Sequence, residues 1–206
     1  MKNALFGIVL SLCMAQMSFA SGYTVEMNTY WSASNVNASQ FDLNIDVFEE
    51  DGSAVFTFMN ESSANLSVSN IFFESGLSSF VNLASPMIQN NSSANLVKYG
   101  KSNNKAWYSA RDVGWTLTGL ALKANGKTLD AGEVIIVKFG LKDEVTIDGL
   151  VIGLTEAGSR IGVNAAYGGN MGAAAISEAY HTPTPTAAMA GLLMVGGLVM
   201  RRRREA

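Results

Sequence analysis

The stretch FDLNIDVFEEDGSAVFTFMN, residues 41–60, decides the fold. From Phe41 to Val47 it alternates apolar side chains with acidic or amide ones. This period of two is typical of a β-strand with one buried face and one wet face. Asp51-Gly52 then favours the tight turn of a hairpin, because both central positions of that turn need a positive φ. The stretch therefore predicts a β-hairpin whose second strand runs to Met59.

Short apolar segments continue along the chain, separated by clusters of Asn, Ser, Asp and Gly that are typical of turns. No long amphipathic helix interrupts them, which favours antiparallel strands over alternating strands and helices. We predict an all-β fold, an antiparallel β-sandwich of Ig-like or jelly-roll-like type, over residues 21–180. Beyond the hairpin, strands are expected at 66–73, 79–83, 106–110, 115–122, 133–139, 145–152 and 160–165, and 168–179 is interpreted as a final strand or a linker.

Residues 1–20 have the organisation of a secretory signal peptide. A charged start precedes an apolar run, and Ser18-Phe19-Ala20 supplies the small residues that a signal peptidase needs. We expect signal peptidase to cut between Ala20 and Ser21. Cys13, the one cysteine of the chain, leaves with this segment, so the mature chain has no disulfide and no thiolate site. A lipoprotein cleavage at Cys13 is the less favoured alternative, because the preceding leucine is large.

Residues 181–206 form a second targeting segment in three parts. Pro183-Thr184-Pro185 interrupts regular structure, residues 187–200 are apolar, and Arg201, Arg202, Arg203 and Arg204 follow. A helix over 187–200 measures about 21 Å, shorter than the roughly 20 residues that span a bilayer comfortably. The arginines are expected to stay cytoplasmic and to hold the Pro-containing stretch at the outer face for a processing enzyme. A permanent, thin anchor is the alternative.

The charge of the central part argues against some partners. Between residues 21 and 180 there are nine basic and sixteen acidic side chains, a net charge of −7. Such a surface repels phosphate backbones, so we predict that the protein does not bind nucleic acid.

Catalytic and metal-binding patterns are weak. His181 is the one histidine and stands in the expected linker, away from any framework that would orient it against a nucleophile. A histidine-based metal centre lacks ligands, and no glycine-rich phosphate loop follows a strand. We therefore predict no enzyme activity, no cofactor and no metal. A hydrolase that uses two of the acidic residues is a distant alternative, since nothing in the sequence singles out a pair.

Aromatic residues in the second half offer a candidate ligand site. Trp107, Tyr108 and Trp115 could stack against sugar rings, with Arg111 at the rim. The competing interpretation is that these rings fill the interior, because tryptophan in strands is usually part of the core.

The three-part tail is similar to the PEP-CTERM sorting signal that exosortase recognises and removes in Gram-negative-type bacteria. Pro183 and Pro185 match its Pro-acid-Pro element, and Thr184 replaces the usual glutamate. Segments of the body, including 55–60, 71–76, 129–133 and 160–163, also resemble exported proteins with this tail. The resemblance implies an exported protein without an assigned activity, associated with the surface or matrix and often with exopolysaccharide.

Together these observations predict an exported structural or binding protein of the cell surface or extracellular matrix, associated with exopolysaccharide or biofilm and without catalysis. The expected partners are signal peptidase, an exosortase-like enzyme, the inner membrane transiently, and exopolysaccharide. The alternative is a polysaccharide-binding module that uses Trp107 and Trp115 as an aromatic platform.

Overall fold

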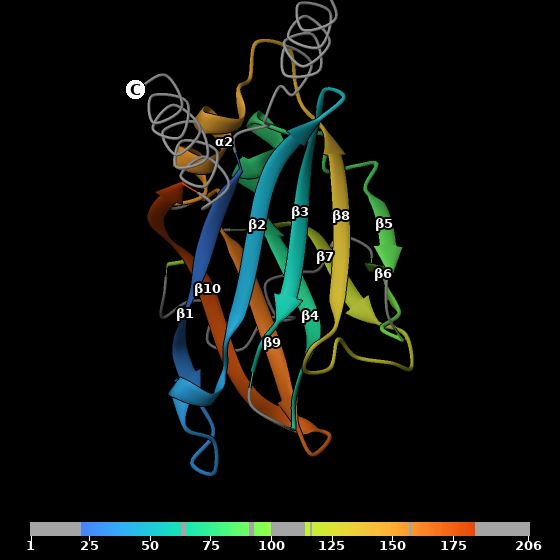
Figure 1. Ribbon diagram of the computed structural model, residues 1–206, viewed down its shortest axis with the longest axis vertical. Helices are drawn as coiled ribbons and strands as arrows, with labels where there is room; N and C mark the ends of the chain where they lie inside the picture. The colour runs from blue at the N-terminus through green and yellow to red at the C-terminus, as the bar shows by residue number, and fades with distance from the viewer. Residues whose placement is uncertain are drawn as a thin grey trace, which may run out of the picture. The chain divides into compact units, whose positions relative to one another are not determined.

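The hairpin predicted from residues 41–60 is confirmed in the computed structural model of the protein (Figure 1), which describes residues 22–62, 65–90, 93–99, 114–115, 117–156 and 158–183. Strand β2 (Leu43–Glu50) pairs antiparallel with β3 (Ser53–Asn60), and Glu50 lies opposite Ser53. The two residues between them have positive φ, 50° at Asp51 and 70° at Gly52. This is the conformation that a two-residue hairpin loop requires.

All described strands belong to one antiparallel sheet of ten, in the order β5-β8-β3-β2-β1-β10-β9-β4-β7-β6. The all-β antiparallel class is therefore confirmed. The remaining strands are β1 (Tyr23–Ser32), β4 (Leu66–Glu74), β5 (Met87–Asn90), β6 (Leu96–Tyr99), β7 (Thr118–Ala124), β8 (Val134–Gly140), β9 (Ile161–Tyr167) and β10 (Asn170–Pro183).

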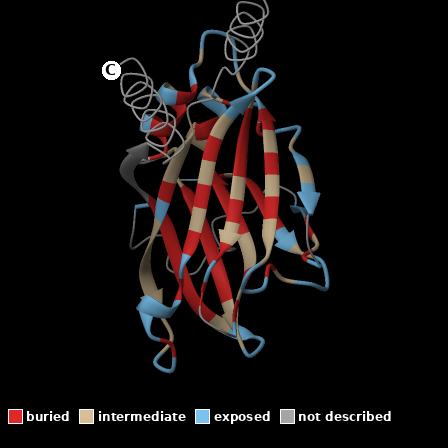
Figure 2. Ribbon diagram, viewed as in Figure 1, coloured by how far each residue is buried: buried red, intermediate tan, exposed pale blue. Residues whose placement is uncertain are grey.

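The sheet bends over on itself, so that β2, β3 and β8 lie in front of β9, β4 and β7 in Figure 1. Phenylalanines from the two halves meet edge to face: the ring centroids of Phe56 and Phe73 are 6.0 Å apart, and those of Phe73 and Phe139 are 5.1 Å apart. Figure 2 shows the alternating buried bands on β2 and β8 that follow from the period of two. Burial of apolar area between the two halves is the main source of stability.

One continuous sheet replaces the two separate sheets of the predicted Ig-like or jelly-roll-like sandwich. The two halves are joined through the pairing of β1 with β10, which lie in the middle of the strand order. The edge strands β5 and β6 also approach each other: the Leu96 amide of β6 donates to Asn90 Oδ1 of β5 at 3.3 Å. The facing layers of a sandwich are thus present, but the chain makes them from a single sheet.

The prediction of a strand over 145–152 is wrong, because helix α2 (Ile147–Gly153) occupies this segment. Thr146 caps its start: the Thr146 hydroxyl accepts a hydrogen bond from the Gly149 amide at 3.2 Å. The apolar residues follow a helical period, since Ile147, Leu150, Val151 and Leu154 are all buried in the core. The β-branched residues of this segment suggested a strand, and the core contacts along one helical face determine the outcome.

The prediction of a strand over 79–83 is also wrong. A short 3-10 helix, η2 (Ser75–Ser79), is followed by a turn in which the Leu77 carbonyl accepts from the amides of Phe80 and Val81, both at 3.0 Å. Only an isolated bridge between Val81 and Leu141 is left of the expected strand. Another 3-10 helix, η1 (Ala38–Gln40), precedes β2.

The other expected strands have different outcomes. Those over 66–73, 133–139 and 160–165 correspond to β4, β8 and β9, and the strand expected from 115 begins at Thr118 as β7. The segment 168–179 is largely strand β10 rather than a linker. The strand expected at 106–110 lies outside the described residues. Strands β1, β5 and β6 were not predicted.

Both ends of the described chain lie at the same end of the sheet, because Tyr23 of β1 pairs with Pro183 of β10. Strand β10 thus includes the first proline of the tail motif. Proline lacks an amide hydrogen, which suits a position where ladder pairing stops. Among the residues that the structure describes, no helix is long and apolar enough to cross a membrane.

Candidate functional site

Of the residues predicted to form the aromatic platform, the structure describes Trp115. Trp115 is 7% exposed, and its indole Nε1 donates to Thr118 Oγ1 at 3.0 Å. Its ring packs with Phe72, Ala121 and Ile176. This position fits the interpretation of Trp115 as a packed interior residue, because a platform needs an open ring face. Trp107, Tyr108 and Arg111 lie outside the described residues.

An ion pair that was not predicted, between Glu74 and Arg160, holds this region together. The Glu74 carboxylate is fully buried and accepts from Arg160 Nε at 3.0 Å and from Arg160 Nη2 at 3.1 Å. It also accepts from the backbone amides of Gly158 and Arg160, at 2.9 and 3.0 Å. The Arg160 guanidinium lies 5.9 Å from the centroid of the Trp115 ring. Glu74 therefore fixes the turn before β9 to the end of β4.

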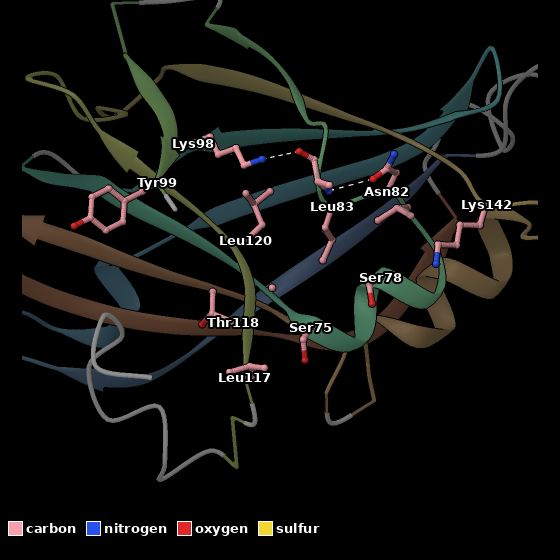
Figure 3. A pocket seen from close by; sticks show the side chains of 13 residues that line it. Ser75, Ser78, Asn82, Leu83, Lys98, Tyr99, Leu117, Thr118, Leu120 and Lys142 are labelled. Carbon is pink, nitrogen blue, oxygen red and sulfur yellow. Dashed lines mark hydrogen bonds between the residues drawn. The ribbon is translucent and has the colours of Figure 1, made fainter. Parts of the chain in front are cut away.

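A hollow of about 570 Å³ lies where the chain leaves β4. This volume falls within the range of small-molecule sites. Figure 3 shows the hollow, which we call the lysine groove. The groove is lined by Ser75, Ser78, Val81, Asn82, Leu83, Ala84, Lys98, Tyr99, Leu117, Thr118, Gly119, Leu120 and Lys142.

The charge of the groove differs from that of the rest of the protein. Its lining includes the two cations Lys98 and Lys142, and none of the described lining residues carries a carboxylate. Asp143 and Glu144 follow Lys142 in the chain but do not line the groove. In Figure 3 Lys98 and Lys142 lie on either side of Leu83 and Asn82. The groove is thus a local positive site on a body with a net charge of −7.

Two hydrogen bonds shape the end of the groove near Lys98. The ammonium of Lys98 donates to the Ala84 carbonyl at 2.6 Å, and the Ala84 amide donates to Asn82 Oδ1 at 3.2 Å. These contacts connect edge strand β6 to the turn before edge strand β5. An ammonium group has three donors, so Lys98 keeps hydrogen-bonding capacity for a ligand after its contact with Ala84.

Exposed apolar groups border the same hollow. Tyr99 is 53% exposed and Leu117 is 52% exposed, although both are large apolar side chains. Lys123 Nζ lies 5.3 Å from the centroid of the Tyr99 ring. A cation at this distance is attracted to the ring face and restricts how the ring can turn. Because Tyr99 follows Lys98 on β6, its ring lies on the opposite face of the sheet from the Lys98 side chain, as Figure 3 shows.

The wall of the groove leaves no room for a side chain at Gly119. A Cβ placed there would lie 2.8 Å from Leu83 Cδ1 and 2.9 Å from Ser75 Cα. The Ser75 amide also donates to the Leu117 carbonyl at 2.7 Å, which brings η2 against the start of β7. The close approach of these two segments forms the wall between the hollow and the core.

Sequence reasoning missed every residue of this groove. Lys98, Leu117 and Lys142 belong to segments far apart in the chain, and no spacing or motif connects them. They line one hollow because the sheet bends until the segments that carry them lie near each other. The predicted processing residues Ala20, Ser21, Thr184, Pro185 and Arg201–Arg204 lie outside the described residues, and Pro183 ends β10.

No group of three or more His, Cys, Asp or Glu side chains that could hold a metal ion is present in the part of the chain that the structure describes. No protein-family model, curated protein or solved structure matches this chain.

Proposed function

We propose that the protein is exported, sorted through its C-terminal tail, and acts without catalysis as a structural or binding component of the cell surface or extracellular matrix. The observation that carries this proposal is the paired arrangement of targeting segments, a signal peptide over 1–20 and a Pro-apolar-Arg tail over 181–206. Signal peptidase and an exosortase-like enzyme remove them, and the chain is held in the inner membrane only in between.

The fold is compatible with removal of both ends. The sheet begins at Tyr23 and ends at Pro183, so cleavage after Ala20 and within the tail leaves every described strand intact. The central position of β1 and β10 also means that processing at either end must stop outside these strands for the sheet to survive.

A second candidate function is polysaccharide binding. One observation supports it, the lysine groove, which combines hydroxyl groups, apolar side chains and two cations in a single hollow. Such mixtures of apolar surface and a few polar groups are typical of ligand sites.

The tail can be tested by replacing Arg201–Arg204 together with glutamine, and with lysine as the matched control. Cells that produce the protein are fractionated, and the chain is detected in cytoplasm, membrane, surface and medium. We expect the native protein and the lysine variant at the surface or in the medium, because lysine keeps the positive charge. The glutamine variant should lose much of this fraction. Native protein confined to the cytoplasm would contradict export.

A further inference from the structure

We infer that residues 179–183 of β10 form a latch, which must separate from β1 before the processing enzyme can cut the tail. The tail is thus protected while the latch is paired and becomes a substrate when the latch opens. This inference rests on the proposed sorting function and adds a regulatory step to it.

The pairing of β10 with β1 is interrupted where the latch begins. Glu178 lies opposite Glu26, and the next pair along the strands is Thr182 opposite Thr24. Between these pairs β10 has three residues and β1 has one, so two residues of β10 are extra. A bulge of this kind leaves the extra residues unpaired and disrupts the ladder locally. The bulge therefore separates the end of the latch from the rest of β10.

Few contacts hold the chain beyond this bulge. The latch pairs with β1 at Thr182, opposite Thr24, and at Pro183, opposite Tyr23. Proline has no amide hydrogen, so Pro183 donates no hydrogen bond to the ladder. On the other side of β10, the pairing with β9 ends at Ile176. Among the described strands, the latch therefore pairs with β1 alone.

Strand β1 is fixed more firmly at this end of the sheet, so the latch is the part that moves. β1 also pairs here with β2, and Thr24 lies opposite Asp46. The Thr24 hydroxyl donates to Asp46 Oδ1 at 2.7 Å, the Tyr23 hydroxyl donates to Asp148 of α2, and Val25 is buried in the core. β1 keeps these contacts when the latch separates. Such local opening needs much less free energy than unfolding of the whole sheet.

The closed latch leaves little free chain for an enzyme to bind. Only residues 184–186 separate Pro183 from the apolar segment that starts at Ala187. Three extended residues measure about 10 Å, and the five residues of an open latch lengthen this stretch to about 26 Å. Proteolysis concentrates on chain that is not tied into a strand. When opening is fast relative to cutting, the rate of cutting follows the population of the open form.

A disulfide that closes the latch tests the inference in cells that export the protein. Thr24→Cys/Thr182→Cys places thiols on opposite residues, and the Cα separation of about 4.5–5.5 Å in an antiparallel pair suits a disulfide. The native Cys13 belongs to the signal peptide and does not compete in the exported chain. We expect the oxidised variant to keep its tail, with a processed fraction about tenfold or more below that of the native protein. Dithiothreitol should restore processing.

Matched variants separate closure of the latch from the substitutions themselves. Glu26→Cys/Glu178→Cys places the same cross-link on the other side of the bulge, where the latch stays free, and should be processed like the native protein. The single variants Thr24→Cys and Thr182→Cys should also be processed like the native protein. Thiol labelling shows whether each cross-link has formed.

Hydrogen exchange gives an independent measurement on the native full chain, purified in detergent. Amides of residues 179–182 should exchange about tenfold faster or more than those of residues 173–177 in the same strand. If a cross-link does not form, this measurement decides alone.

Three results would overturn the inference. These are native processing of the oxidised Thr24→Cys/Thr182→Cys variant, an equal block in Glu26→Cys/Glu178→Cys, or equal exchange protection along the whole of β10. A native chain that keeps its tail in every sample would instead contradict the proposed sorting function. The two failures are therefore distinguishable.

Discussion

Replacement of Arg160 by methionine should destabilise the protein strongly, because it leaves the fully buried Glu74 carboxylate without its counter-charge. Removing one partner of a buried ion pair costs about 3–5 kcal/mol in free energy of unfolding. Glu74 would still accept from the amides of Gly158 and Arg160, so we expect the lower end, about 3 kcal/mol. For a domain of this size that lowers Tm by roughly 6–12 °C.

Urea unfolding followed by tryptophan fluorescence measures this effect through the midpoint and the slope. The matched control is Lys138→Met, which breaks the ion pair between Lys138 and the half-exposed Glu50 and should cost at most about 1 kcal/mol. Glu74→Leu/Arg160→Met should be less destabilised than the sum of the two single changes, because it leaves no buried charge unpaired. A loss below about 1 kcal/mol in Arg160→Met would refute the reasoning.

Two further changes test the packing of the fold by thermal or urea unfolding. Gly153→Ala places a Cβ 2.5 Å from Phe80 Cζ and should lower the free energy of unfolding by about 1–3 kcal/mol. Gly149→Ala in the same helix, where the nearest atom is 3.4 Å away, should leave the stability unchanged or raise it by up to about 1 kcal/mol. Equal changes in stability for the two variants would contradict the clash. Asn60→Ala removes the side-chain amide that donates to the Leu66 and Leu129 carbonyls, at 3.0 and 2.9 Å, and should lower the free energy of unfolding by roughly 2–5 kcal/mol. A change in stability of less than about 0.5 kcal/mol would exclude this role for Asn60.

The parts of the fold that are specified locally could be predicted from the sequence. The hairpin between Leu43 and Asn60 needs only a period of two and a turn whose residues accept positive φ, and both are visible in the chain. Helix α2 was not predicted, because its local sequence favours a different structure from the one it adopts. Its β-branched residues favour a strand in isolation, and the cap at Thr146 and the contacts of one helical face with the core outweigh that preference.

The long-range parts could not be predicted. Strand β1 has little alternation, and it becomes a central strand because it pairs with β10, about 150 residues further along the chain. The single bent sheet follows from that pairing and has no local signal. The same holds for the lysine groove, whose cations come from separate segments, and for the Glu74–Arg160 pair, which joins residues 86 positions apart.

Intact mass spectrometry of the protein recovered from the surface or medium of the cells that produce it tests the central claim most directly. Our account predicts a mass that lacks residues 1–20 at one end and the apolar and arginine parts of the tail, residues 187–206, at the other. A mass that still includes residues 187–206 would contradict processing of the tail. A mass that still includes residues 1–20 would contradict export through a signal peptide.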